Sequence, residues 1–251
     1  MKNKKLYEYY RRQGERYRVS AVSEFERDMA QRLVAMTLTQ RVLKTLSSYL
    51  RGSGLLDVGC GRGWYLYNVM HSCESAVGVD ISWGHLKQAK LLTRDADGLS
   101  IAQGDANKLP FQDGAFDIVL AVDVLEHLMQ PQEALREVRR VLRKGGKALV
   151  CVPSVLNPTE WAGRLINVVQ GHFQDHLHFY TPRTAKRTME LAGFEVVYTT
   201  TCCFLPTILG GTEFRASFFR KTYSFLELKL SNVPSISRLG ASIILLVTPR
   251  D

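Results

Sequence analysis

The sequence predicts an α/β fold in which helices cover both faces of a mostly parallel β-sheet. Between residues 55 and 152, five short apolar runs alternate with segments of helical periodicity. Runs that are apolar throughout are typical of strands buried on both faces, as in parallel sheets. An acidic residue lies within or directly after each of the first four runs. Because ligands of such sheets bind beyond the carboxyl ends of the strands, these acids predict a binding site there.

Length and composition predict one domain, spanning residues 1–251. A chain of 251 residues that is 45% hydrophobic is long enough to bury a full core. No apolar run approaches the roughly 20 residues that cross a bilayer, and the basic N-terminus lacks the apolar segment of a signal peptide. Five cysteines, an odd number without metal-type spacing, indicate reduced thiols. We therefore expect a cytoplasmic protein.

The net charge of +9 is distributed unevenly. Residues 1–51 carry 12 Lys and Arg against 5 Asp and Glu, and residues 183–251 carry 9 against 5, whereas residues 52–182 carry 12 against 14. The basic segments favour an anionic partner such as nucleic acid, a membrane surface or an acidic substrate. A solvated face without a partner is an equal alternative.

The N-terminal segment has two parts. Residues 1–18 mix tyrosines with arginines, a combination that binds nucleic acid through stacking and phosphate pairing. A helix folded over a ligand pocket and a mobile end are the alternatives. Residues 23–50 place apolar side chains at steps of three and four, which predicts one or two amphipathic helices. Glycines at 52 and 54 end this segment.

The stretch 55–63 (LLDVGCGRG) is an apolar run that meets three glycines at alternate positions. It predicts a buried strand, a tight turn and a helix start, with the backbone open to close approach by a ligand. A dinucleotide-binding loop requires a glycine at the sixth position of its fingerprint, and Trp64 occupies that position. The turn therefore disfavours a pyrophosphate ligand.

The remaining elements follow from run length and periodicity. The core segments are predicted as helices over 64–71, 84–92 and 131–142, strands over 76–81, 99–106, 116–123 and 147–152, and a turn at 144–146. Residues 153–180 interrupt the alternation. Thr181 and Pro182 then suit the N-cap and first position of a helix that runs to residue 191. Strands over 194–200 and 241–248 flank an aromatic stretch at 214–226.

Three acids at consecutive strand ends indicate the ligand. Asp80, at the second strand end, suits a ribose diol because a carboxylate accepts both hydroxyl protons. Asp105, at the third, can accept a hydrogen bond from the amino group of adenine, and Asp57 can balance a positive charge. Together they predict an adenosine ligand with a cationic tail and no phosphates.

Five motifs occur in the order and spacing of a known family: residues 55–63, 78–82 (GVDIS), 104–110 (GDANKLP), 116–128 (FDIVLAVDVLEHL) and 142–153 (LRKGGKALVCVP). The chain resembles the class I S-adenosylmethionine-dependent methyltransferases of the type-11, ubiquinone-biosynthesis-like branch. Residues 176–182 (HLHFYTP) extend the resemblance towards residue 200.

The resemblance implies a Rossmann-like three-layer sandwich with a seven-stranded, mostly parallel sheet whose last strand is antiparallel. It also implies a helical cap over residues 1–50, a cofactor-binding core over 51–155, and substrate-side inserts with the completion of the sheet over 156–251. The implied cofactor is S-adenosyl-L-methionine, with S-adenosyl-L-homocysteine as the product.

The resemblance further assigns residues to the methionine part of the cofactor. Gly59, Cys60 and Gly61 would contact it through their backbone. Asp57 would lie near its ammonium, to which Val122 would offer a carbonyl.

Other residues are assigned to the nucleoside. Asp80 would hold the ribose hydroxyls, and Ile81 would lie on the adenine face. Asp105 and Ala106 would flank the adenine amino group, whereas Asp123 would face either the cofactor or the substrate.

Methyl transfer requires a general base only when the acceptor is a weakly acidic hydroxyl or amine, and histidine is the usual choice. The candidate catalytic residues are His127, His176 and His178. His172, His176 and His178 have a spacing that suits a metal, but neither Cys nor Glu joins them in the sequence, so no metal is predicted. A role in the substrate pocket and ordinary hydrogen bonding are both open for these histidines.

The acceptor is expected to be small and apolar or amphiphilic, such as a quinone precursor or a lipid. Residues 122–125 (VDVL) lack the Asn/Asp-Pro-Pro-aromatic signature of many N-methylating relatives, which lowers the expectation of base methylation. The aromatic stretch 214–226 suits an apolar pocket, and its basic residues suit peripheral contact with an anionic membrane. Core packing of these aromatics is equally open. The alternatives are an RNA or protein methyltransferase that uses the basic N-terminal segment and a non-catalytic binding protein with a cofactor fold.

Overall fold

The computed structural model describes residues 29–94, 96–157, 176–204 and 238–250, together with residues 229 and 233. The predictions for the basic N-terminal arm, for His172 and for the aromatic stretch at 214–226 lie outside these residues. None of the helices in the described part of the chain is long and apolar enough to cross a lipid bilayer.

One sheet of seven strands forms the centre of the molecule, in the order β3-β2-β1-β4-β5-β7-β6. The strands β1 to β5 pair in parallel, and β7 lies antiparallel between β5 and β6. The predicted fold class is therefore confirmed, including the antiparallel last strand. The strand bounds are β1 (Gly54–Val58), β2 (Ser75–Asp80), β3 (Leu99–Gln103), β4 (Phe116–Val122), β5 (Leu142–Pro153), β6 (Phe194–Cys202) and β7 (Ser242–Pro249).

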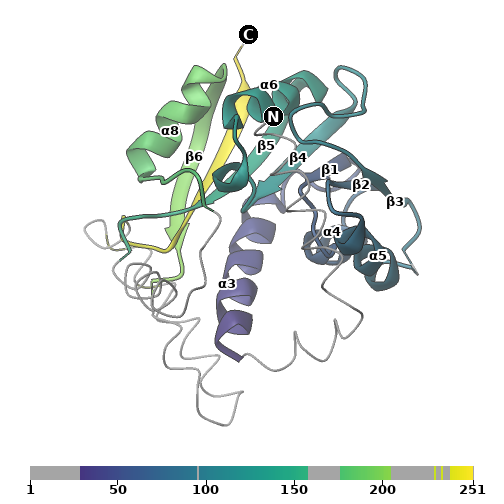
Figure 1. The fold of residues 1–251 in the computed structure, drawn as a ribbon, viewed down its shortest axis with the longest axis horizontal. Helices are drawn as coiled ribbons and strands as arrows, with labels where there is room; N and C mark the ends of the chain where they lie inside the picture. Colours follow the sequence, from purple (N-terminus) through teal and green to yellow (C-terminus); the bar gives the residue numbers. More distant parts are fainter. Residues whose placement is uncertain are drawn as a thin grey trace.

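Helices cover both faces of the sheet, as Figure 1 shows. The helices are α3 (Met29–Leu46), α4 (Trp64–Val69), α5 (Trp83–Leu92), the short 3-10 helix η1 (Leu125–His127), α6 (Pro131–Val141) and α8 (Pro182–Leu191). Buried side chains of α3, α4 and α5 belong to one apolar cluster, and those of α6 and α8 belong to a second. In β1, Leu55 joins the first cluster and Leu56 the second. Burial on both faces explains why the strands are apolar throughout.

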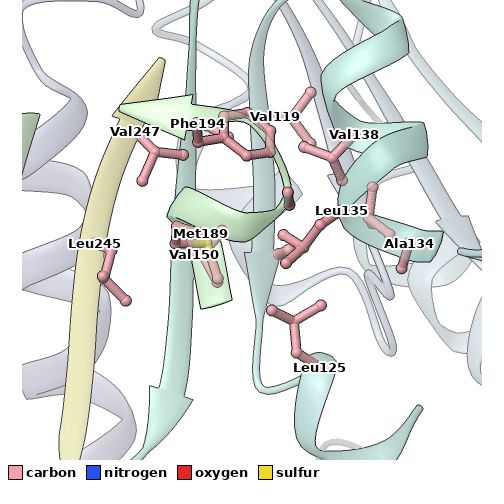
Figure 2. Close-up of a cluster of buried hydrophobic side chains, with 14 of the residues drawn as sticks. Val119, Leu125, Ala134, Leu135, Val138, Val150, Met189, Phe194, Leu245 and Val247 are labelled. Carbon is pink, nitrogen blue, oxygen red and sulfur yellow. The ribbon is translucent and has the colours of Figure 1, made fainter. Parts of the chain in front are cut away.

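The cluster beneath α6 and α8 is drawn in Figure 2. Leu135 of α6 and Met189 of α8 are fully buried against the sheet, which contributes Val119, Val150 and Leu245. Complete burial of a Leu or Val side chain stabilises the fold by about 1.5–3 kcal/mol relative to exposure. The central strands are therefore held firmly, and their carboxyl ends form a rigid platform.

The start of α8 confirms a prediction made from two residues. Thr181 is the N-cap: its side chain accepts a hydrogen bond from the Thr184 N–H at 3.1 Å, and Thr184 Oγ1 accepts one from the Thr181 N–H at 2.8 Å. Pro182 follows at the first helical position. This capping box satisfies two N–H groups that the helix leaves unpaired.

The region predicted as a turn at 144–146 is instead an irregular start of β5. Phe116 pairs with Leu142, but the next pair joins Ile118 to Lys147, so the residues in between bulge out of register. Gly145 adopts a left-handed φ of 77°, which permits the bulge. The local glycines indicated the bend. The pairing with β4, which makes this segment part of a strand, joins residues far apart in the sequence and has no local signal.

Candidate active site

A cavity of about 610 Å³ opens at the carboxyl ends of β1, β2 and β4 and beside the residues that follow β3. This volume lies within the range of small-molecule sites. Its position is the one that parallel α/β sheets use for ligands. The lining residues are Gly59, Gly61, Val79, Asp80, Ile81, Ser82, His85, Gly104, Asp105, Ala106, Asn107, Asp123, Val124, His127, Leu128, Met129 and Gln130.

The glycine turn after β1 is bonded directly to the end of β2. The N–H groups of Gly59 and Cys60 both donate to the Val79 carbonyl, at 2.7 and 3.0 Å. Gly59 and Gly61 have φ values of 69° and 52°, in the left-handed region that glycine adopts readily. A Cβ on Gly59 would lie 2.5 Å from Val124 Cγ2. The turn therefore lies close against the residues that follow β4, and its backbone lines the cavity.

Helix α3 is tied to the same turn through Trp64. The indole Nε1–H of Trp64 donates to Thr39 Oγ1 of α3 at 2.8 Å. Trp64 starts α4, and the preceding Gly63 is left-handed with a φ of 81°. The residue that excluded a dinucleotide loop thus has a structural role, because it fastens α3 beside the site.

Asp80 is held by backbone N–H groups on both of its oxygens. Its Oδ2 accepts from Gly61 N–H and its Oδ1 from Ser82 N–H, each at 2.8 Å. The Nδ1 atom of His85 lies 4.0 Å from Oδ1, and burial lowers the pKa of His85. Each carboxylate oxygen has two lone pairs, so Asp80 can still accept hydrogen bonds from a ligand.

Asp57 lies behind the turn and is only 2% exposed. Within the described part of the chain, its Oδ2 has no hydrogen-bond partner. Burial, with a smaller contribution from the charge of Asp80, raises the pKa of Asp57 to about 8. A cationic group placed beside this carboxyl would lower that pKa again and offset the cost of burying the charge.

The residues after β3 form the outer wall of the cavity. Asp105 is exposed and accepts from Asn107 N–H at 2.8 Å, a local turn that fixes the direction of the carboxylate. Ala106 lies next to it on the cavity wall. Ile81 directly follows β2 on the same wall, and its carbonyl accepts from Gln103 Nε2 at 2.9 Å.

Beyond β4 the chain passes through a strained residue into η1. Asp123 lines the cavity with a φ of 53°, and its N–H donates to the Cys151 carbonyl at 3.1 Å. Glu126 is only 1% exposed, and burial together with the charge of Asp123 raises its pKa to about 8. The adjacent His127 lines the cavity.

The structure separates the three predicted catalytic histidines. The ring of His176 packs edge-on against that of His127, with centroids 4.9 Å apart. His178 instead forms a hydrogen bond from its ring Nε2 to the Leu128 carbonyl, at 2.9 Å. Of the three histidines, His127 alone lines the cavity, and His176 lies directly beside it.

Most residues predicted for the cofactor lie at the cavity. Six of the nine line it: Gly59, Gly61, Asp80, Ile81, Asp105 and Ala106. Asp57, Cys60 and Val122 are buried and do not line it. The apolar wall of Leu128 and Met129 was not anticipated, because it follows from the turn of η1 and has no periodic pattern in the sequence.

Comparison with known proteins shows which family has this arrangement. Residues 56–150 match the family model described as a methyltransferase domain. A protein of Encephalitozoon cuniculi that is named as a methyltransferase is 35% identical over 162 residues, which cover 63% of this chain and 71% of that protein. Demethylmenaquinone methyltransferase of Staphylococcus saprophyticus is 35% identical over 120 residues, and the match spans 46% of this chain and half of the relative.

A solved structure is similar over most of the chain. The SAM-dependent methyltransferase from Thermotoga maritima superposes with a TM-score of 0.65 and covers 91% of this chain and 96% of its own, at 21% identity. At this identity the likeness concerns the fold.

The first prediction concerns the buried acid. Replacing Asp57 by asparagine is expected to stabilise the ligand-free protein increasingly as the pH rises from about 5 to about 8. The unfolded chain loses the Asp57 proton near the ordinary pKa of 3.8, whereas the folded protein keeps it up to about 8. The wild type therefore loses stability as the pH rises through this window, and asparagine removes the loss. The difference in the free energy of unfolding should grow by at most about 1.4 kcal/mol per pH unit in urea titrations.

Asp97, an exposed acid before β3, supplies the matched control as Asp97→Asn. The lowered pKa of His85 acts in the opposite direction but is common to all variants, so it cancels in the comparison. A difference between Asp57→Asn and wild type that stays constant from pH 5 to pH 8 would contradict the assignment.

Proposed function

Because this chain belongs to the class I S-adenosylmethionine-dependent methyltransferase family, we propose that it methylates a small, apolar or amphiphilic acceptor such as a quinone precursor or a lipid. The reaction class and the cofactor follow from the family. The acceptor is our inference, and the observation that carries it is the uncharged, apolar wall formed by Val124, Leu128 and Met129.

The residues of the site fit the cofactor on independent grounds. The buried Oδ2 of Asp57, which has no hydrogen-bond partner in the described part of the chain, would be stabilised by a cation. The methionine part of the cofactor carries such a group, an ammonium. The glycine turn exposes backbone to the cavity without a Cβ between, which admits this part of the ligand. In the proposal Asp57 lies near the ammonium group and Val122 offers its carbonyl to the same group. Cys60 contacts the methionine part through its backbone.

The nucleoside is proposed to lie along the ends of β2 and β3. Asp80, held at both oxygens by N–H groups, is oriented to accept from the two ribose hydroxyls. Ile81 supplies an apolar surface for adenine, and Asp105 and Ala106 lie beside its amino group. This arrangement leaves the wall of η1 for the acceptor.

When bound, the cofactor supplies a methyl group on a sulfonium, and transfer to a nucleophilic atom of the acceptor leaves S-adenosylhomocysteine. The protein contributes mainly by holding the acceptor in line with the methyl group, which lowers the barrier by several kcal/mol, on the order of what other oriented reactions gain. His127 lines the acceptor side, and Glu126 Oε1 lies 3.9 Å from its Nε2. This group is placed to take up a proton from a hydroxyl or amine.

The charge of the cavity supports a neutral acceptor. Among its described lining residues there is no Lys or Arg, whereas Asp80, Asp105 and Asp123 are all acidic. A phosphate-bearing acceptor such as RNA would meet net negative charge there. The demethylmenaquinone methyltransferase among the relatives is named for an apolar quinone, which agrees with the proposal. We place the protein in the cytoplasm, with peripheral contact to an anionic membrane as the route to a lipid-like acceptor.

The second prediction tests the cofactor. Asp80→Asn is expected to weaken the binding of S-adenosylhomocysteine about 10- to 100-fold, since the ribose hydroxyls lose a charged acceptor. Calorimetric titration measures the affinity. Asp97→Asn, remote from the cavity, should bind as the wild type does. Wild-type protein that binds neither S-adenosylmethionine nor its product would refute the placement of the cofactor.

The third prediction tests the acceptor. With radiolabelled methyl donor and a cell extract, the label should appear in organic-soluble small molecules. Met129→Glu, which puts a charge on the apolar wall, should raise the apparent KM for the purified acceptor about 10-fold, because a Met side chain contributes about 1.5–3 kcal/mol when buried. Leu91→Glu, an exposed position on α5 outside the cavity, should leave KM unchanged.

Label recovered in RNA or in protein instead would overturn the acceptor class while leaving the cofactor assignment intact. In the RNA case, binding should also weaken steeply as salt is added, because counterions compete for the phosphates.

A further inference from the structure

Three potential metal ligands converge beside the cavity from two distant segments of the chain. Glu126 and His127 belong to η1, and His176 comes from the segment that precedes α8. One ligand atom from each of the three side chains lies within 4.8 Å of the other two. The Oε1 atom of Glu126 lies 3.9 Å from Nε2 of His127, which is longer than a hydrogen bond.

Backbone hydrogen bonds hold the two segments together. The carbonyl of Glu126 accepts from Leu177 N–H at 2.7 Å and from His178 N–H at 3.3 Å. The ring of His178 forms a further hydrogen bond to the Leu128 carbonyl at 2.9 Å. The histidine that does not join the cluster therefore fastens the segment that carries His176. These contacts preorganise the group without any ion.

The buried carboxylate supplies the second, independent observation. Glu126 is 1% exposed, and its Oε2 has no hydrogen-bond partner among the residues that the structure describes. An oxygen of a buried carboxyl group that lacks a hydrogen-bond partner is energetically unfavourable. A cation bound at this point would supply a partner for that oxygen.

We propose that Glu126, His127 and His176 form a binding site for a divalent transition-metal ion at the acceptor end of the cavity. Two imidazole nitrogens and one carboxylate oxygen suit ions such as Mn²⁺, Fe²⁺, Co²⁺ and Zn²⁺. Tetrahedral coordination with bonds of about 2.1 Å places ligand atoms about 3.4 Å apart. The three ligand atoms, which lie within 4.8 Å of one another, would have to move closer together through side-chain rotation to reach that spacing.

The site leaves coordination positions that face the cavity. His127 lines the cavity, as does the neighbouring acid Asp123. Three protein ligands with an open position are the pattern of catalytic rather than structural metal sites. The open position is available to an oxygen atom of the acceptor.

The role of the ion rests on the proposed methyl transfer, although its binding does not. With the ion bound, His127 would be a ligand rather than a base, and a hydroxyl oxygen bound to the ion would release its proton to solvent more readily than a free hydroxyl does. The oxygen then forms a bond to the methyl carbon as the carbon–sulfur bond breaks, and the electron pair of that bond stays on sulfur. The ion changes no oxidation state in this step.

The fourth prediction tests the ion directly with Mn²⁺, which, unlike Zn²⁺, has little affinity for the five free cysteines. The full chain is stripped with a chelator and titrated with MnCl₂ at pH 8, and electron paramagnetic resonance measures free Mn²⁺. We expect one site per chain. His176→Ala and the isosteric Glu126→Gln should each weaken it at least 10-fold. His71→Ala, at an exposed histidine far from the cluster in sequence, should have no effect.

Binding of S-adenosylhomocysteine by the same variants shows that they are folded, so a loss of Mn²⁺ binding is separated from a loss of structure. It also separates this proposal from the proposed function, since donor binding and ion binding can fail independently. A wild-type protein without a stoichiometric Mn²⁺ site, or a His176→Ala variant that binds as the wild type does, would overturn the proposal.

Discussion

The geometry of the site depends on the hydrogen bonds between the glycine turn after β1 and the end of β2. Two N–H groups of the turn, from Gly59 and Cys60, share the carbonyl of Val79, and the N–H of Gly61 holds the carboxylate of Asp80. The turn also leaves no room for a Cβ between Gly59 and Val124, which follows β4. Three strand ends are thereby placed around one cavity, and Gly59 and Gly61 adopt the left-handed φ values of this turn, which glycine reaches readily. Because the strands are buried on both faces, the strand ends that form these contacts are held in place.

Sequence patterns predict the part of this structure that local chemistry determines. The apolar runs and the cap of α8 at Thr181 are set by neighbours in the chain, and the structure places them as expected. Of the acids predicted at the strand ends, Asp80 and Asp105 line the cavity, whereas Asp57 is buried behind it. The insertion of β7 between β5 and β6 came from family resemblance, since strand order has no local signal. The approach of His176 to Glu126 joins residues 50 positions apart. In the sequence His176 lies close to His172 and His178, and no local pattern links it to Glu126.

Two buried carboxyls make the site costly for the ligand-free fold. Asp57 and Glu126 are each less than 3% exposed, and each has an oxygen without a hydrogen-bond partner among the described residues. Burial raises both pKa values to about 8. Protein interiors rarely keep such groups unless a cation meets them. In this account the ammonium group of the methyl donor meets Asp57, and a divalent ion meets Glu126. The same physical cost therefore marks both ends of the cavity, the donor end and the acceptor end.

The most direct test of the central claim is the number of protons released when S-adenosylhomocysteine binds. Asp57 is protonated below its pKa of about 8 in the free protein and should ionise when the ligand ammonium comes to lie beside it. Calorimetric titration at pH 6.5, in two buffers that differ in ionisation enthalpy, counts the released protons. The account predicts a release close to one proton per chain for wild type and almost none for Asp57→Asn. Binding without proton release, or equal release by both proteins, would contradict it.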